Sequence, residues 1–176
     1  CTGLNQPSLY NAFGDKRCLY RRALTHYLEC TVRERIRRLE GLPDAGTAIT
    51  LFFTEVLDRS LNDPLHRGCL LVNSALEAHT DDADLRQAIA EEFETIRSFF
   101  ESRLQAFSLQ GDGVREIDAK QGAHHLLSLL LGIRVLARLN PDPACVTDAV
   151  DLALNSLGLT PLALATLTKS PCTESP

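Results

Sequence analysis

Apolar residues recur every three or four positions through most of this chain, a spacing that predicts amphipathic helices and not strands. Clusters of Gly, Pro, Asn and Asp interrupt the pattern and divide it into separate segments. We therefore predict an all-α fold, with helices at about residues 15–39, 45–61, 64–79, 82–109, 115–139 and 143–158.

Two of these segments, 115–139 and 143–158, are apolar on more than one face, which the surface helix of a monomer cannot satisfy. Two such helices from each subunit would form a symmetric four-helix dimer interface. The alternative is one central helix buried within a single subunit. For the dimer we expect interface residues at Leu126, Leu130, Ile133, Leu136, Val146, Val150 and Leu154.

A short helix of about two turns is predicted near the start of the chain. Asn5 is a good N-cap, Pro7 falls in the first turn where a missing N–H costs nothing, and Gly14 supplies a left-handed stop. One face of this helix is apolar. The opposite face carries hydrogen-bonding groups suited to base edges and phosphate oxygens, at Gln6, Ser8, Tyr10 and Asn11.

The next helix begins with Asp15 as its N-cap, yet Lys16 and Arg17 occupy its first turn. The helix dipole disfavours a cation there by roughly 0.3–1 kcal/mol, and a bound anion would reverse that penalty. We therefore predict a phosphate-binding helix start beside the short helix. The alternative is a solvated pair of charges.

Residues 3–16, Gly-Leu-Asn-Gln-Pro-Ser-Leu-Tyr-Asn-Ala-Phe-Gly-Asp-Lys, closely resemble the turn, recognition helix and following helix start of TetR/AcrR-family transcriptional regulators. Residues 67–77 look like the central ligand-domain helix of one large branch of that family, and residues 132–139 look like its dimerisation helix. The resemblance implies a homodimeric repressor that binds a palindromic double-stranded DNA operator and is released by a small-molecule effector. It assigns DNA binding to Asn5, Gln6, Pro7, Ser8, Tyr10, Asn11 and Lys16.

A helix-turn-helix also needs a first helix and a supporting helix, and both should precede Gly3. We therefore expect the DNA-binding domain to be incomplete in this sequence. The expected organisation is the end of a helix-turn-helix domain and a connecting helix in 1–38, a ligand-binding and dimerisation domain in 39–160, and a disordered tail in 161–176.

Charge is distributed unevenly along the chain. Residues 1–40 hold eight Lys or Arg against four Asp or Glu, whereas the remainder holds ten against nineteen, for an overall charge of −5. The negative net charge of the complete chain therefore does not argue against nucleic-acid binding by its first residues. The arginines between 33 and 38 are interpreted as a solvated helix face.

A ligand site is predicted around the 64–79 segment, where Asn73 lies in an otherwise apolar stripe with Cys69, Val72 and Leu76. Asn73 is either a pocket donor or a satisfied core amide. Cys69 is either a small buried hydrophobe or a thiol that reacts with electrophiles or oxidants near a helix start. The candidate apolar walls, each also explicable as ordinary core, are Phe52, Phe53, Phe93, Phe100 and Leu127.

Other classes of protein find little support in the sequence. The six cysteines form no C-x-x-C pair, and the adjacent His124 and His125 point about 100° apart on a helix, so we expect no metal and no disulfides. Without a catalytic motif, a signal peptide or an apolar membrane span, we expect a cytoplasmic protein that is not an enzyme and uses no cofactor. The competing function is a helical ligand-binding or dimerisation module without DNA binding.

Overall fold

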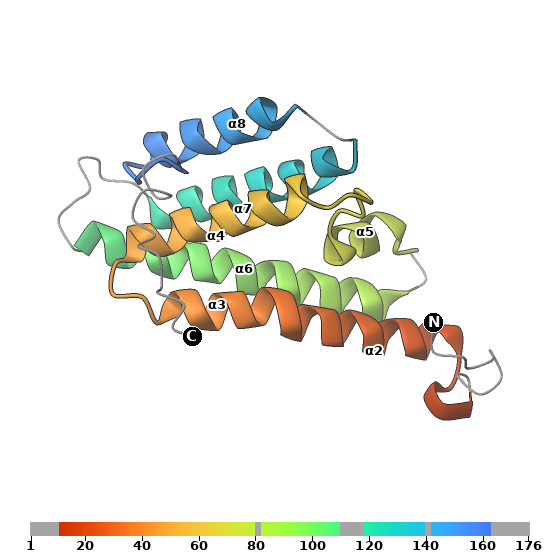
Figure 1. Ribbon diagram of the computed structural model, residues 1–176. Helices are drawn as coiled ribbons and strands as arrows, with labels where there is room; N and C mark the ends of the chain where they lie inside the picture. Colours follow the sequence, from red (N-terminus) through yellow and green to blue (C-terminus); the bar gives the residue numbers. More distant parts are fainter. Residues whose placement is uncertain (1–10, 80–81, 110–117, 140–141, 163–176) are drawn as a thin grey trace, which may run out of the picture.

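The computed structural model describes residues 11–79, 82–109, 118–139 and 142–162, and all regular secondary structure within these ranges is helical (Figure 1). This confirms the predicted all-α class. The helices, with one π-helical and one 3₁₀ segment, are α2 (Lys16–Leu28), η1 (Glu29–Arg33), α3 (Glu34–Glu40), α4 (Ala45–Leu61), α5 (Leu70–Glu77), α6 (Ala83–Leu109), α7 (Ala119–Leu136), η2 (Ala137–Leu139) and α8 (Pro143–Ser156).

Aspartate side chains begin most of these helices. Each accepts a hydrogen bond from a backbone N–H of the first turn at 2.7–3.1 Å, which satisfies donors that have no partner inside the helix. The capping residues are Asp15, Asp44, Asp118 and Asp142. The sequence prediction for Asp15 is therefore confirmed, as is the left-handed conformation of Gly14, at φ 89°.

The core is built where α4 and α6 meet, with α7 beside them and α8 covering α4 and α7 (Figure 1). Four buried phenylalanine rings fill its centre. Phe53 stacks on Phe100 at 5.6 Å between ring centroids, and Phe52 meets Phe100 edge-on at 5.0 Å. Such pairs contribute about 0.5–1.5 kcal/mol beyond their area burial, so this cluster fixes the position of α4 against α6.

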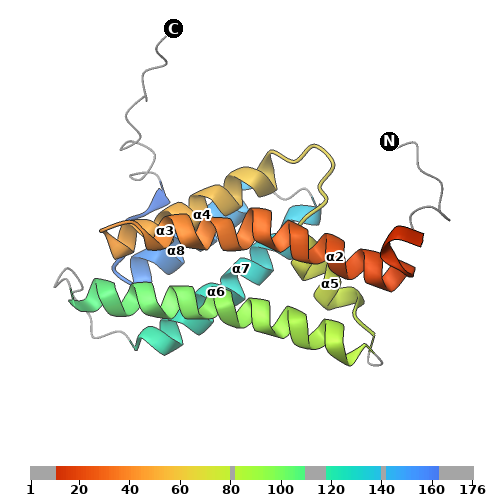
Figure 2. The ribbon, with the colours of Figure 1, turned by 90° about the horizontal axis from the view of Figure 1, so that it is seen from below.

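Residues 16–40 form one continuous rod, in which α2 and α3 are joined through η1 and run along one side of the molecule beside α6 (Figures 1 and 2). Its buried residues Leu24, Leu28, Val32 and Ile36 recur at steps of four. On an ideal α-helix each such step would drift by about 40°. The wider π turn takes up part of that drift and keeps the stripe against the core.

The predicted helix 64–79 is shorter in the structure, where α5 begins only at Leu70. Gly68 has a left-handed φ of 72°, and a Cβ at this position would lie 2.7 Å from Cγ of Arg138. The carboxylate of Asp63 accepts the backbone N–H of Leu65 and that of Arg67, which holds the segment as an irregular turn. Tertiary packing against the end of α7 therefore overrides the helical pattern before Leu70.

Most of the predicted dimer residues lie on the inner faces of α7 and α8 and pack within their own subunit. The inner side of α7 contacts α6, α4, α5 and α8, which accounts for part of its apolar surface, while Val135 and Leu136 on its outer side stay exposed. Buried inside the subunit are Leu126, Leu130, Ile133, Val146, Val150 and Leu154. Of the predicted set only Leu136, with 39% of its surface exposed, can reach a partner.

The same helix corrects a second expectation. Ala119–Leu139, with a mean hydropathy of 1.2, is the one segment of the described chain long and apolar enough for a membrane span. Its inner side packs on α4, α6 and α8, and 39% of the apolar window is buried inside the subunit, so length and composition alone are weak evidence for a span.

Ordered packing continues slightly past the predicted boundary of the tail at residue 161. Leu162 is buried, and its N–H donates to the Asp151 carboxylate at 2.8 Å. The Thr50 hydroxyl donates to the Thr160 carbonyl at 2.9 Å. Residues 163–176, which make up the rest of the predicted tail, lie outside the described residues.

Candidate functional site

Five of the predicted DNA-contacting residues, Asn5, Gln6, Pro7, Ser8 and Tyr10, lie outside the described residues, and their role stays a prediction. The structure begins with the last turn of the predicted short helix, where residues 11–13 are helical and Asn11 is exposed. The guanidinium of Arg22 lies 5.6 Å from the ring centroid of Phe13. This contact joins the short helix to α2.

The first turn of α2 contains one free cation. Lys16 is exposed and has no partner in the part of the chain that the structure describes. Hydrogen bonds from Cys18 to the capping carboxylate lower the pKa of Asp15, so the cap is ionised at neutral pH. Arg17, which the sequence analysis placed beside Lys16 at a phosphate, instead forms an ion pair with Asp82. The helix start therefore offers Lys16 alone.

Two further contacts join the first turns of α2 to the starts of α5 and α6. The Tyr20 hydroxyl lies 2.7 Å from the Ser74 hydroxyl, and Ser74 donates in turn to the Leu70 carbonyl. Arg21 pairs with Asp84 at 3.4 Å. A shift of α5 or of the start of α6 would therefore be transmitted to the N-terminal end of the rod.

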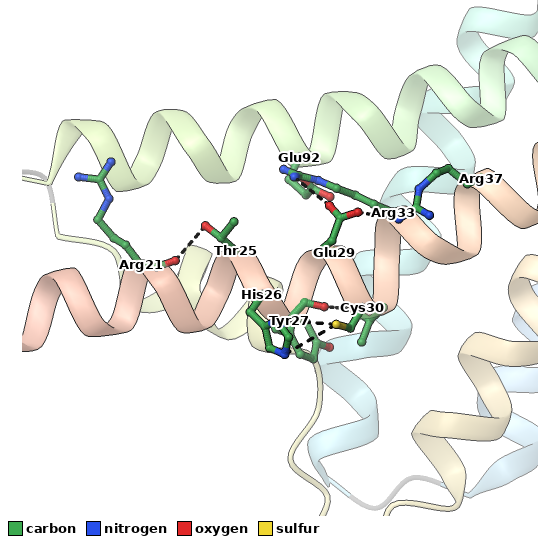
Figure 3. Close-up of polar contacts among 10 residues, drawn as sticks. Arg21, Thr25, His26, Tyr27, Glu29, Cys30, Arg33, Arg37 and Glu92 are labelled. Atoms are coloured by element: carbon green, nitrogen blue, oxygen red, sulfur yellow. Dashed lines mark hydrogen bonds and ion pairs between the residues drawn. The ribbon is translucent and has the colours of Figure 1, made fainter. Parts of the chain in front are cut away.

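The middle of the rod is joined to α6 through η1 (Figure 3). Arg33 donates to Oε2 of the buried Glu92 at 2.9 Å, and this hydrogen bond raises the pKa of Arg33. Glu29 accepts from Arg33 and from Arg37 on the outer side of the turn. Arg35 is buried. The predicted solvated arginine face is therefore wrong for Arg35, whereas Arg33 stays exposed although it bonds Glu92.

A cavity of about 630 Å³ lies between the rod, the end of α4, the irregular turn 62–69 and α7. The rod contributes Tyr27, Thr31, Val32 and Arg35 to its wall. The other lining residues are Asp58, Arg59, Asn62, Asp63, Pro64, Arg67, Gly68, Cys69, Leu70, Asn73 and Arg134. This volume is in the range of small-molecule sites.

Two predicted ligand residues, Cys69 and Asn73, do line this cavity. The Asn73 side chain donates to the Arg67 carbonyl at 3.0 Å and accepts from Arg138 at 3.1 Å, so it is a satisfied amide at the cavity wall. Cys69 is buried, and the Tyr27 hydroxyl donates to its Sγ at 3.7 Å. Burial raises the pKa of Tyr27, which keeps that hydroxyl protonated. Reaction of Cys69 with electrophiles stays a prediction.

A second, smaller space of about 20 Å³, large enough for one water, adjoins the cavity. The predicted walls Phe52 and Phe93 line it, in largely apolar surroundings. Both spaces share four wall residues, Val32, Arg35, Cys69 and Arg134.

The remaining predicted walls, Phe53, Phe100 and Leu127, line neither space. Phe53 and Phe100 are fully buried against one another, and Leu127 packs on the core. These three residues are core, which was the alternative that the sequence left open.

The arginines that line the cavity were not among the ligand residues predicted from the sequence. Arg134 stands between Ile133 and Val135 in an apolar run, and a charge in such a run is the signal that could have identified it. Within the described ranges, no three His, Cys, Asp or Glu side chains gather closely enough to hold a metal ion. The described cysteines, Cys18, Cys30, Cys69 and Cys145, are all free thiols.

Comparison with known proteins gives one consistent result. Residues 46–153 match the model of the family described as tetracyclin repressor-like, C-terminal domain. The chain is 28% identical over 157 residues to the uncharacterized HTH-type transcriptional regulator YezE of Bacillus subtilis (strain 168), covering 88% of this chain and 80% of that protein.

Solved structures of TetR-family transcriptional regulators are also similar to the chain. Two cysteine mutants of the TetR family transcriptional regulator CifR, both complexed with 26-bp double-strand operator DNA, match with TM-scores of 0.76 and 0.77 at 31% and 30% identity. These matches cover 87% and 88% of this chain and 80% of each CifR chain. A TetR transcriptional regulator from Rhodococcus sp. RHA1 matches with a TM-score of 0.59 at 28% identity, over 90% of this chain and 84% of that one.

Proposed function

This chain belongs to the TetR family of transcriptional regulators, which are not enzymes, and we propose that it is a cytoplasmic, homodimeric repressor released from its operator by a small molecule. The observation that carries the proposal is the rod 16–40. Its N-terminal end presents the exposed Lys16, and its middle lines the 630 Å³ cavity. One rigid element therefore joins a DNA-facing end to a ligand-facing wall.

Operator binding is assigned to the short helix before Gly14 and to Lys16. The left-handed Gly14 turns the chain directly into the capped start of α2, so free N–H groups and one lysine meet beside the reading helix. The CifR structures, whose chains contact operator DNA, support this assignment by their similarity to the chain.

Dimerisation is assigned to the outer faces of α7, η2 and α8. Large apolar side chains stand exposed there at Val135, Leu136, Leu139 and Leu152. Gly132 lies on the same side, and a Cβ built on it would meet nothing within 4 Å, which leaves room for the backbone of a second helix. A two-fold pair of these faces would place two reading helices on two half-sites.

Release is assigned to the contacts between the rod and the cavity. A ligand that contacts Tyr27 or Thr31 would press on the rod next to η1, and a ligand that displaces α5 would act through the Tyr20 and Ser74 hydroxyls. An effector can shift DNA affinity only by binding the two states of the rod unequally.

Lys16→Ala tests the DNA assignment, and Lys120→Ala is the matched control. Lys120 is also exposed, but it lies in the first turn of α7, at the opposite end of the molecule from the start of α2 (Figure 1). The assay is fluorescence anisotropy of the full-length protein on operator DNA from 50 to 200 mM salt. We expect Lys16→Ala to weaken binding and to lower the salt slope by about one, because one phosphate contact is lost.

An unchanged salt slope in Lys16→Ala, or an equal change in Lys120→Ala, would remove Lys16 from the DNA interface. A protein that dimerises and binds ligand but shows no operator binding would instead support the competing function, a ligand-binding module without DNA binding.

A further inference from the structure

The wall of the cavity is positively charged although the whole chain carries −5. Four arginines line it against two aspartates. Asp63 is occupied by Arg67, which donates to it from its side chain at 3.0 Å, and Asp58 accepts from Asn62 at 2.9 Å. Asp63 is therefore paired within the turn, whereas Asp58 on α4 keeps its charge and accepts from a neutral amide; neither forms an ion pair with Arg35 or Arg134 among the described residues.

Arg134 is the buried arginine of this wall whose charge no carboxylate of the described residues pairs with. Its side chain comes from α7 and is 9% exposed, and no ion pair to it is seen among residues 11–79, 82–109, 118–139 and 142–162. Its one hydrogen bond goes to the Ser60 hydroxyl at 2.9 Å, and that hydroxyl donates onward to the Val56 carbonyl. A buried guanidinium held by a single neutral oxygen keeps most of its donors free.

Two further arginines increase the positive potential near Arg134. Arg35 is buried and forms an ion pair with Glu55 at 3.0 Å. Glu55 also forms an ion pair with Arg38 at 2.7 Å, so one carboxylate is shared by two arginines. Burial lowers the pKa of Arg35, and the nearby charges of Arg134 and Arg59 lower it further. Arg59 is exposed at the rim and has no partner within the described residues.

The cavity also has apolar wall residues beside the arginines. Tyr27, Val32, Pro64 and Leu70 contribute them. A ligand whose charged group meets the arginines could pack its apolar part against these residues.

We propose that the effector is a small organic anion, whose carboxylate or equivalent group is bound by Arg134 with Arg59 at the rim, and whose apolar part packs against Tyr27 and Leu70. This proposal rests on the proposed function only in calling the ligand an effector; the binding itself is independent of DNA. Arginine presents a planar set of donors that matches a carboxylate, so an anion would satisfy the donors that the subunit leaves free.

Paired probes test the charge requirement. Benzoate, phenylacetate and octanoate are each compared with the corresponding primary amide at pH 7.5 and constant ionic strength, and sodium sulfate serves as the control for a general anion effect. Thermal unfolding and isothermal titration calorimetry are measured on the full chain. We expect at least one carboxylate, at ten times its Kd, to raise Tm by about 3–6 °C, and the corresponding amide to have no comparable effect.

Arg134→Met tests the residue. Met keeps an unbranched, flexible side chain, shorter than Arg, and removes a buried charge, so Tm without ligand should stay equal or rise. Carboxylate affinity should fall at least tenfold, to that of the amide. Arg59→Gln, at an exposed position that tolerates change, should weaken the carboxylate by a smaller factor, and Arg86→Gln, an exposed arginine on α6 that does not line the cavity, should leave it unchanged.

The proposal would be overturned if carboxylates and amides bind equally well, or if no probe binds at millimolar concentration. It would also be overturned if Arg134→Met binds the carboxylate with full affinity. If Arg134→Met does not fold, the comparison of Arg59→Gln with Arg86→Gln decides, and equal affinities in these two would count against it. Operator binding is measured separately. If the wild-type protein binds its operator but no anion, the anion proposal is refuted and the proposed function stands.

Discussion

Val150 and Leu152 lie two positions apart on α8, and truncating each should affect a different property. Val150 is 0% exposed inside the subunit, whereas Leu152 is 73% exposed. If the outer face of α8 forms the dimer, Leu152→Ala should weaken association and leave the folding of each subunit intact. Val150→Ala should do the reverse.

The magnitudes follow from the atoms removed. Leu152→Ala deletes three carbons, which at about 0.8 kcal/mol each amounts to roughly 2 kcal/mol per subunit if the partner covers them. Two-fold symmetry doubles the effect to roughly 4 kcal/mol, which raises the dimer Kd by about 10³-fold. Val150→Ala deletes two buried methyl groups and should lower the free energy of unfolding by about 1–3 kcal/mol.

Sedimentation equilibrium over a range of protein concentrations gives the dimer Kd, and urea unfolding at one fixed concentration gives the free energy of unfolding. Leu109→Ala is the control, because Leu109 is also exposed but lies at the end of α6. A dimer Kd unchanged in Leu152→Ala, or raised as much in Leu109→Ala, would refute the assignment of the interface to α8.

Two further predictions concern ion pairs. Arg33→Ala should lower the free energy of unfolding by about 2 kcal/mol, because it leaves the 2% exposed Glu92 carboxylate without its partner, and Arg33→Ala with Glu92→Leu should recover most of that loss in the same urea assay. A double variant no more stable than Arg33→Ala would contradict this reasoning. Hydrogen bonds from Arg67 lower the pKa of Asp63 to about 2, below its ordinary 3.8, so its stabilisation is present above pH 4 and is lost as the pH falls toward 2. The Tm difference between wild type and Asp63→Asn should therefore shrink from pH 5 to pH 2. A constant difference would show that the contact with Arg67 does not lower the pKa of Asp63.

Hydrophobic spacing predicted the helices well where burial alone decides them. The predicted segment 45–61 is α4 to the residue, and 82–109 differs from α6 by one residue. The spacing did not reveal which neighbour buries each face. Val150 and Leu154 are apolar because α8 packs on its own subunit, and the sequence cannot distinguish that from contact with a second copy.

The cavity could be predicted only in part, because its walls come from distant segments. Cys69 and Asn73 were found from one helical stripe, within a single segment. Arg35 and Arg134 are ninety-nine positions apart, and only the packing of the rod beside α7 brings both to one space. Taken singly, each arginine was consistent with a solvated charge.

The π turn η1 sets the angular relation between the two ends of the rod. It holds one residue more than an α-helical turn needs, and each residue of an α-helix accounts for about 100° of rotation and 1.5 Å of rise. Deleting one residue from Glu29–Arg33 would let an ordinary α-helical turn form, and the two ends of the rod would keep nearly the same angular relation. Deleting one residue from the regular part of α2 or α3 would instead turn Lys16 by about 100° relative to the cavity wall.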